Sequence, residues 1–338
     1  MSLTKVSYSM IEGSTGVENV GIGENVFSSI TTGSSNTAFG YNALAANTSG
    51  YGNVAIGLSA LSSNTTADQN TAVGRFALEN NTVGFENVAL GTSALGANTT
   101  GNINIAIGRK AGLRNTTGSE NVAIGTNSIG NEASPGVSTG DGNTAVGRNT
   151  LEDNTTGENN TAIGRTALPS NTTGNLNTAL GYAALLNNTT GNDNVAIGAS
   201  ALATSTTVGA NVAVGRFALN LATNERNTAI GNNALSATTT GTNVIGIGDN
   251  AQASSATASN EATIGNNNIA EIRAPGIGLS LTSTIIEITS GKIVFGTGSP
   301  EGATTASVGS LYLRVDGGAN TTLYVKESGT GNTGWVAK

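Results

Sequence analysis

The chain has 338 residues, a formal net charge of −7, and neither cysteine nor histidine. It therefore has no disulfides, no thiolate or imidazole ligands for a metal, and no histidine to act as a general base. Its acidic balance without a basic patch argues against a nucleic-acid partner, and no apolar run approaches the roughly 18 residues that a membrane-spanning helix needs.

Residues 1–17 form the first segment, because they do not follow the repeat that begins after them. The opening run from Met1 to Tyr8 contains no charged region followed by an apolar stretch, so we expect no secretory signal peptide. We expect no membrane insertion and no cofactor elsewhere in the chain either.

A seventeen-residue unit repeats about fifteen times between Asn19 and Ala270. Counted from position one, it reads Asn, Thr or Val, Ala, Ile or Val, Gly, two variable residues, Ala, Leu, two variable residues, Asn, Thr, Thr, Gly and two variable residues. A fixed period indicates one structural unit stacked on copies of itself. We therefore assign residues 18–272 to a repeat domain.

Each unit contains two short strand candidates, of which Asn53–Gly57 and the weaker Ala60-Leu61 are examples. A helix over Ala-Leu has little room, since Gly comes shortly before it and Asn-Thr-Thr-Gly shortly after. The unit therefore predicts one coil of a parallel β-solenoid. We expect corners at Asn-Thr-Thr-Gly and at the position-five Gly, where φ is positive or backbones approach closely. The corner glycines are Gly40, Gly57, Gly74, Gly91, Gly108, Gly125, Gly147, Gly164, Gly181, Gly198 and Gly215.

The first strand candidate has two apolar faces. Position three is usually Ala and position four is bulky, as in Ala55 and Ile56, and neither position is charged. Successive residues of a strand face opposite sides, so one face lines the coil and the other is expected to pack against another subunit. This pattern predicts an obligate oligomer, most simply a homotrimeric rod, and leaves open which face is the interface.

Asparagines recur at positions one and twelve, and we expect them to form ladders of side-chain amides between stacked coils. Some of the position-twelve residues also read as Asn-x-Thr glycosylation acceptors, although a structural role is favoured. Charged residues flank the strand candidates, and we interpret them as a solvated outer surface rather than a binding stripe. These are Arg75, Arg109, Arg148, Arg165 and Arg216 after the Gly, and Glu86, Glu120 and Asp193 before the repeat start.

Residues 273–338 depart from the repeat and alternate like antiparallel strands. A small C-terminal β domain that caps the open edge of the solenoid is expected, because bare sheet edges aggregate. Asp316-Gly317-Gly318 has the composition of a hairpin turn. The strand candidates are Gly278–Leu281, Ile285–Ile288, Lys292–Phe295, Leu311–Arg314 and Leu323–Lys326.

Three parts of the chain resemble known families. The repeat Asn-x-Ala-Ile-Gly resembles the head repeats of trimeric autotransporter adhesins of the Yersinia adhesin type, which are left-handed parallel β-rolls. The segment Leu3 to Ile11 looks like the opening of many phage tail fibre and tailspike proteins. The C-terminal run, from Gly309-Ser310-Leu311 to Gly334-Trp335-Val336-Ala337-Lys338, closely resembles a terminal module that recurs in predicted phage tail fibre proteins.

The resemblance implies a phage virion protein that is assembled in the host cytoplasm. In the fibres it resembles, the N-terminal segment is virion-proximal, which implies attachment to other virion proteins through residues 1–17; the apolar candidates are Leu3, Val6, Tyr8, Met10 and Ile11. The C-terminal domain would then face a host surface glycan or protein. Tyr312, Tyr324 and Trp335 are candidate receptor contacts, or alternatively the core of a trimer-closing cap.

Other functions were weighed against this one. Some tailspikes are glycosidases, but glycoside hydrolysis needs a carboxylate pair at defined spacing, and the acidic residues here are few and scattered, so we expect no enzymatic activity. Rows of Thr could order ice, but they lie beside a corner Gly rather than on a flat strand. A capsid decoration or head fibre and a bacterial trimeric surface adhesin remain alternatives.

Overall fold

The computed structural model describes residues 18–130, 136–266, 271–274, 279–282, 293–296, 299–302, 308, 310–314, 323–329 and 332–338. These residues form strands, turns and bends without a helix, which confirms the predicted all-β class. The chain divides into two compact units, Met1–Asn268 and Ile269–Lys338, and each unit is described by itself. The N-terminal candidates Leu3 to Ile11 lie outside the described residues.

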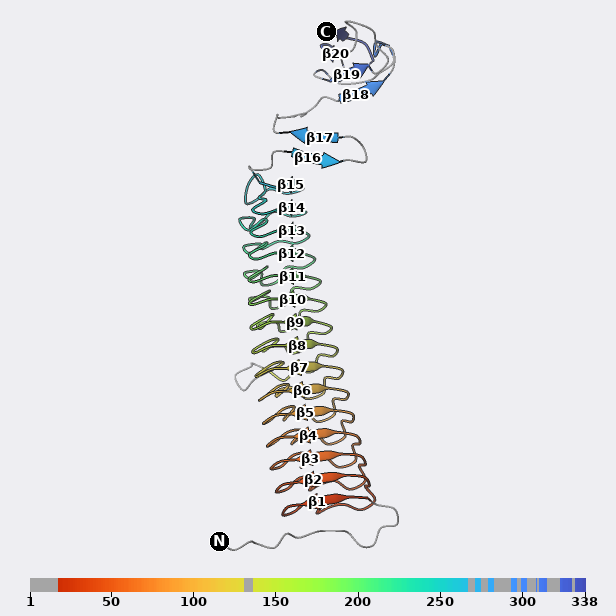
Figure 1. Ribbon diagram of the computed structural model, residues 1–338, viewed down its shortest axis with the longest axis vertical. Helices are drawn as coiled ribbons and strands as arrows, with labels where there is room; N and C mark the ends of the chain where they lie inside the picture. The colour runs from red at the N-terminus through yellow and green to blue at the C-terminus, as the bar shows by residue number, and fades with distance from the viewer. Residues whose placement is uncertain are drawn as a thin grey trace. The chain divides into compact units, whose positions relative to one another are not determined.

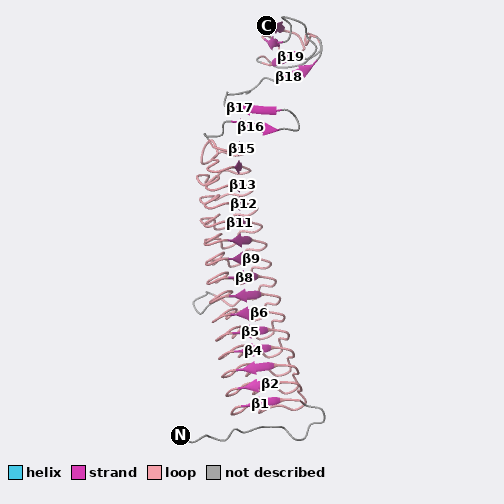
Figure 2. Ribbon diagram, in the orientation of Figure 1, coloured by secondary structure: helices cyan, strands magenta, loops and turns pink. Residues whose placement is uncertain are grey.

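The first unit is a parallel β-solenoid, as predicted (Figure 1). Each coil contributes one three-residue strand, and the strands form one 15-stranded sheet in chain order (Figure 2). The strands are β1 (Val20–Ile22), β2 (Thr37–Phe39), β3 (Val54–Ile56), β4 (Thr71–Val73), β5 (Val88–Leu90), β6 (Ile105–Ile107), β7 (Val122–Ile124), β8 (Thr144–Val146), β9 (Thr161–Ile163), β10 (Thr178–Leu180), β11 (Val195–Ile197), β12 (Val212–Val214), β13 (Thr228–Ile230), β14 (Ile245–Ile247) and β15 (Ala262–Ile264).

Neighbouring strands pair in the register of the repeat, so that Ala55 opposes Ala72 and Ile56 opposes Val73. The sheet therefore stacks identical positions above one another.

The interior of the coil is filled by small and branched side chains. Ala55 at position three, Ala60 at position eight and Leu61 at position nine are fully buried, and the same positions are buried along the stack. The weaker strand predicted over Ala60-Leu61 is wrong, because this segment is a turn. Consecutive residues cannot both point inward from a strand, and here Ser59 and Leu61 adopt positive φ values of 53° and 50°, which curl the chain around its own interior.

The position-five glycines form corners, for both of the expected reasons. Gly57 has φ 137°, a conformation that other residues rarely adopt. A Cβ atom built on Gly57 would lie 2.5 Å from the carbonyl oxygen of Gly74 in the next coil. The backbone thus needs both the torsional freedom and the small size of glycine at this point.

Two ladders of buried asparagines run along the stack, as predicted. Asn53 Nδ2 donates to Asn36 Oδ1 at 3.1 Å and to the carbonyl of Ala67 at 2.8 Å. At position twelve, Asn64 Nδ2 donates to Asn47 Oδ1 and to the carbonyl of Ala67, both at 3.0 Å. These amides are buried donors, so their role is structural and not that of glycan acceptors.

The second unit contains two small sheets. β16 (Glu271–Ala274) and β17 (Leu279–Thr282) form an antiparallel pair. β18 (Ile293–Gly296), β19 (Leu311–Arg314), β20 (Leu323–Lys326) and β21 (Trp335–Ala337) form a four-stranded sheet in that order.

The strands predicted at Leu311–Arg314 and Leu323–Lys326 are confirmed. The prediction of purely antiparallel strands is wrong at one point, because β18 and β19 run parallel. The predicted strand Ile285–Ile288 and the turn Asp316-Gly317-Gly318 lie outside the described residues.

Candidate functional site

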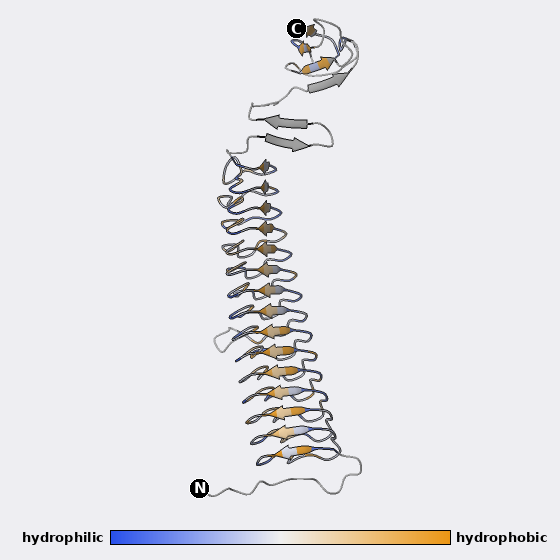
Figure 3. Ribbon diagram, in the orientation of Figure 1, coloured by the Kyte–Doolittle hydropathy of each residue, from blue (hydrophilic) through white to orange (hydrophobic). Residues whose placement is uncertain are grey.

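The outer face of the solenoid sheet is apolar. Because the position-three Ala points inward, positions two and four point outward, and Ile56 is 40% and Leu90 47% exposed. Figure 3 shows hydrophobic colouring along the strands of the whole stack. The structure thus settles which face is which: the small side chains line the coil and the bulky ones are outside. The position-four residues are Ile22, Phe39, Ile56, Val73, Leu90, Ile107, Ile124, Val146, Ile163, Leu180, Ile197, Val214, Ile230, Ile247 and Ile264.

This apolar stripe, defined as positions two and four of β1–β15, is continuous through all the coils. With parallel strands about 4.8 Å apart, it is roughly 70 Å long. Single exposed apolar residues are common on proteins, but contiguous stripes of this extent mark contact sites for other molecules. Position two is mixed: valine, isoleucine or threonine occupies it in β1–β14 and alanine in β15, and it is never charged. The stripe is the main candidate interaction surface of the described residues.

Charged side chains lie along the two borders of the stripe. The five arginines that follow the corner Gly are all exposed, on the C-terminal side of the strands. Arg75 lies with Cζ 4.4 Å from the ring centre of Phe76, and Arg216 makes the same contact with Phe217. On the N-terminal side, Asp68 accepts the Tyr51 N–H at 2.9 Å. Arginines thus predominate after the strand and carboxylates before it, with Glu24 and Asp249 after the strand and Arg226 before it as exceptions.

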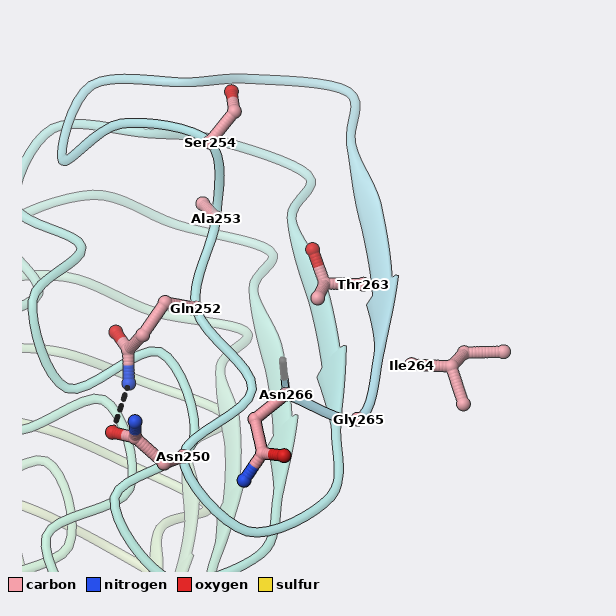
Figure 4. A pocket seen from close by; sticks show the side chains of 8 residues that line it. All are labelled: Asn250, Gln252, Ala253, Ser254, Thr263, Ile264, Gly265 and Asn266. Atoms are coloured by element: carbon pink, nitrogen blue, oxygen red, sulfur yellow. Dashed lines mark hydrogen bonds between the residues drawn. The ribbon is translucent and has the colours of Figure 1, made fainter. Parts of the chain in front are cut away.

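A pocket lies at the last coil of the stack, around β15 (Figure 4). Its lining is made of amides, hydroxyls and small side chains, and Gln252 Nε2 donates to Asn250 Oδ1 at 3.3 Å across it. Nearby, Ser254 donates from its backbone N–H and its hydroxyl to Glu261, and these bonds hold the pKa of that carboxyl below its usual value. The lining carries no acid or base, so it offers no chemistry beyond polar contact.

Tyr312, Tyr324 and Trp335 gather in the interior of the second unit. The Tyr312 ring lies 6.1 Å from that of Tyr324 and 6.0 Å from that of Trp335, both edge to face. Their exposed fractions are 4%, 8% and 7%, so the surface expected to touch a receptor is turned inward. Of the two roles expected from the sequence, this burial supports that of core residues and not that of receptor contacts.

Hydrogen bonds from backbone N–H groups to the Glu301 carboxylate hold the strand that contains Trp335. Glu301 accepts the N–H groups of Gly334 at 3.0 Å and Trp335 at 2.7 Å, which ties the last strand to the segment before β19. These bonds lower the pKa of the Glu301 carboxyl. Lys326 is buried, with Nζ 5.7 Å from the ring centre of Trp335.

The described residues contain no group of three or more acidic side chains placed to hold a metal ion. Within the same residues, no helix has the length and apolar character to cross a bilayer. No family model, no curated protein and no solved structure matches the chain. The functional assignment therefore depends on the repeat, the terminal resemblances and the apolar stripe.

Proposed function

We propose that this chain is a non-enzymatic structural protein of a phage virion, a homotrimeric fibre that acts as spacer and host-surface adhesin. The observation that carries the proposal is the apolar stripe, which runs from β1 to β15 and stays exposed among the described residues of the solenoid. A surface of this kind is stable in water only when another molecule covers it. Three copies around a common axis would each turn the stripe inward.

A spacer role is supported by the uniformity of the coils. Each coil buries the same Ala, Leu and Asn set, and each is bonded only to its neighbours, so the number of coils sets length rather than specificity. The variable positions differ from coil to coil without a repeated group of acids and bases that could act on a substrate. An enzyme would concentrate such groups at one place.

The polarity of the fibre is the second element of the proposal. Residues 1–17 would bind other virion proteins, and the C-terminal unit would face the host surface. Because Tyr312, Tyr324 and Trp335 are buried, receptor contact would use other surfaces of that unit. Gold-labelled antibodies against tags at each end would locate the termini on virions by electron microscopy. A C-terminus inside the particle would reverse the polarity, and labels on the head would favour a head fibre.

Light scattering tests the oligomer directly. The purified chain has a mass of 33.4 kDa, so a trimer should scatter as about three times that value. A folded monomer at micromolar concentration would contradict the proposal. Adsorption of phage that lack residues 273–338 tests the adhesin role separately, provided that the shortened fibre still assembles.

A further inference from the structure

In five of the fifteen coils, the two borders of the apolar stripe match each other in charge or in apolar character. We define the N-side border as the two residues before the Asn of each repeat, and the C-side border as the residue after the corner Gly. In the coil of β9, the N-side border is Glu158 and Asn159 and the C-side border is Arg165. All three side chains are exposed. Six residues lie between Glu158 and Arg165, and they include the strand β9, a distance of roughly 20 Å along the chain. The two borders thus lie on opposite sides of the stripe.

Three coils carry an acid on the N-side border and an arginine on the C-side border. They are the coils of β4, β8 and β9, with the pairs Asp68 and Arg75, Asp141 and Arg148, and Glu158 and Arg165. Within the described residues, no salt bridge joins Arg75 or Arg165 to an acid of its own chain, whereas Arg148 interacts electrostatically with Glu152. Each coil therefore presents one charge of each sign at opposite sides of an apolar surface.

Two further coils carry apolar residues on both borders. In the coil of β3, Tyr51 precedes the strand and Leu58 follows it, and both are exposed. In the coil of β10, Leu176 is 58% and Tyr182 55% exposed. In the coils of β4, β8 and β9 the two borders thus carry opposite charges, and in the coils of β3 and β10 both borders are apolar.

The remaining coils are neutral or unmatched. Arg109 and Arg216 have no acid on the other border of their coils, and Glu86, Glu120 and Asp193 have no arginine. Three coils depart from the pattern: that of β1 has Glu18 and Glu24 on its two borders, that of β13 has Glu225 and Arg226 together on the N-side border, and that of β14 has Asp249 on the C-side border. The matching is therefore concentrated in the coils of β3, β4 and β8–β10.

We propose that copies of this chain associate side by side, parallel and with their coils in register, so that the N-side border of one copy contacts the C-side border of the next. This inference rests on the proposed oligomer. In any cyclic arrangement with the stripes facing the axis, strands run head to tail around that axis, so opposite borders of the same coil meet. Glu158 of one copy then faces Arg165 of its neighbour, and Leu176 faces Tyr182.

The same geometry disfavours the antiparallel alternative. A twofold axis along the strand direction would place N-side borders against N-side borders, which brings carboxylate to carboxylate and arginine to arginine. The border charges thus select orientation and register, while the apolar stripe supplies the contact area. A shift by one coil would also place the charged coil of β9 against the apolar borders of β10.

Cysteine cross-linking tests the register, since the chain has no cysteine of its own. The double variant Glu158→Cys with Arg165→Cys should form disulfides between copies on mild oxidation and run as covalent oligomers in denaturing gels. The matched control, Glu158→Cys with Arg216→Cys, places the cysteines three coils apart, about 14 Å along the stack, beyond disulfide reach. The single variant Glu158→Cys should cross-link only if the copies are antiparallel.

Charge exchange gives an independent test. Either Glu158→Arg or Arg165→Glu alone should weaken association roughly tenfold or more, whereas Arg216→Glu should change it little. The double exchange Glu158→Arg with Arg165→Glu should restore association, and native mass spectrometry should find few mixed oligomers when it is co-expressed with the wild-type chain. Equal effects of all three single variants, or no recovery in the double exchange, would overturn the register. A monomeric wild-type chain would instead refute the proposed oligomer.

Discussion

The solenoid and the C-terminal unit solve the problem of a small core in different ways. The solenoid core is built mainly from Ala, Leu and hydrogen-bonded Asn, and among its described core positions one aromatic ring occurs, Phe27 in the coil of β1. The C-terminal unit instead clusters Tyr312, Tyr324 and Trp335 within one four-stranded sheet. The difference teaches that a repeated fold spreads its stability over many small contacts, whereas an isolated small sheet needs a few large side chains.

The largest effect should come from the aromatic cluster. Trp335→Ala removes a buried ring that contacts Tyr312, and should lower the free energy of unfolding of the C-terminal unit by about 3–5 kcal/mol. Near-ultraviolet circular dichroism, which reports on the packed rings, should lose its signal at a lower temperature. The neighbouring Val336→Ala, at a 39% exposed position, is the control and should have a small effect. Equal effects of the two variants would show that the cluster is not the core.

A corner substitution tests the solenoid in the same way. Gly164→Val introduces a branched side chain at φ 129°, where a Cβ would lie 2.6 Å from the carbonyl oxygen of Gly181. The backbone strain should cost about 1–3 kcal/mol per chain in thermal unfolding followed by far-ultraviolet circular dichroism. In the C-terminal unit, Gly302 also has a positive φ, but a Cβ there meets no atom within 4 Å. Gly302→Val should therefore be milder, and a reversed order would contradict the corner assignment.

Substitutions in the apolar stripe should weaken the association of copies and not the folding of the single chain. Leu90→Asn changes a half-exposed side chain, and should weaken association by about 1–2 kcal/mol per chain while leaving the secondary structure of the solenoid unchanged. Light scattering over a dilution series measures this change. Thr66→Asn, on an exposed turn away from the stripe, is the matched control. A stripe variant that assembles like the control would mean that another surface holds the copies together.

The smallest expected effect is a pH dependence that differs between the two units. The N–H groups of Gly334 and Trp335 hold the pKa of Glu301 below the ordinary value of a glutamate. The stability that these bonds contribute is therefore present above that ordinary value and is lost as the pH falls through the lowered pKa. In the solenoid, burial raises the pKa of Glu152. Stability should therefore fall as the pH rises from the ordinary pKa of a glutamate towards the raised one, which is the opposite trend. Thermal unfolding midpoints measured between pH 3 and 6 should show this. Glu301→Gln should remove the loss of stability at low pH, and Glu152→Gln should remove the loss as the pH rises.

The resemblance-based part of the function stays a prediction. The N-terminal residues that carry the likeness to phage fibres lie outside the described part of the chain. The C-terminal run resembles a module of predicted tail fibre proteins, and its aromatic residues are buried in the structure. Localisation of the termini on virions is therefore the measurement with the greatest bearing on function.

Local sequence rules were enough to determine the period, the first strand of each coil, the corner glycines and the asparagine ladders, but not the turn at Ala60-Leu61. Each of these depends on one coil and its copy seventeen residues away, as in the pairing of Asn53 with Asn36. Where every contact is between equivalent positions, the repeat itself specifies the partner of each residue.

Only the tertiary structure decided which side of the strand became the interior. Alternation along Val54–Ile56 defines two faces, but the curl of the chain through Ser59 and Leu61 determines which of them the coil encloses. That curl depends on positive φ values at non-glycine residues, which the composition does not reveal. The burial of Tyr312, Tyr324 and Trp335 was undecided for the same reason: it depends on β19, β20 and β21 meeting in one sheet, a long-range pairing that no local pattern encodes.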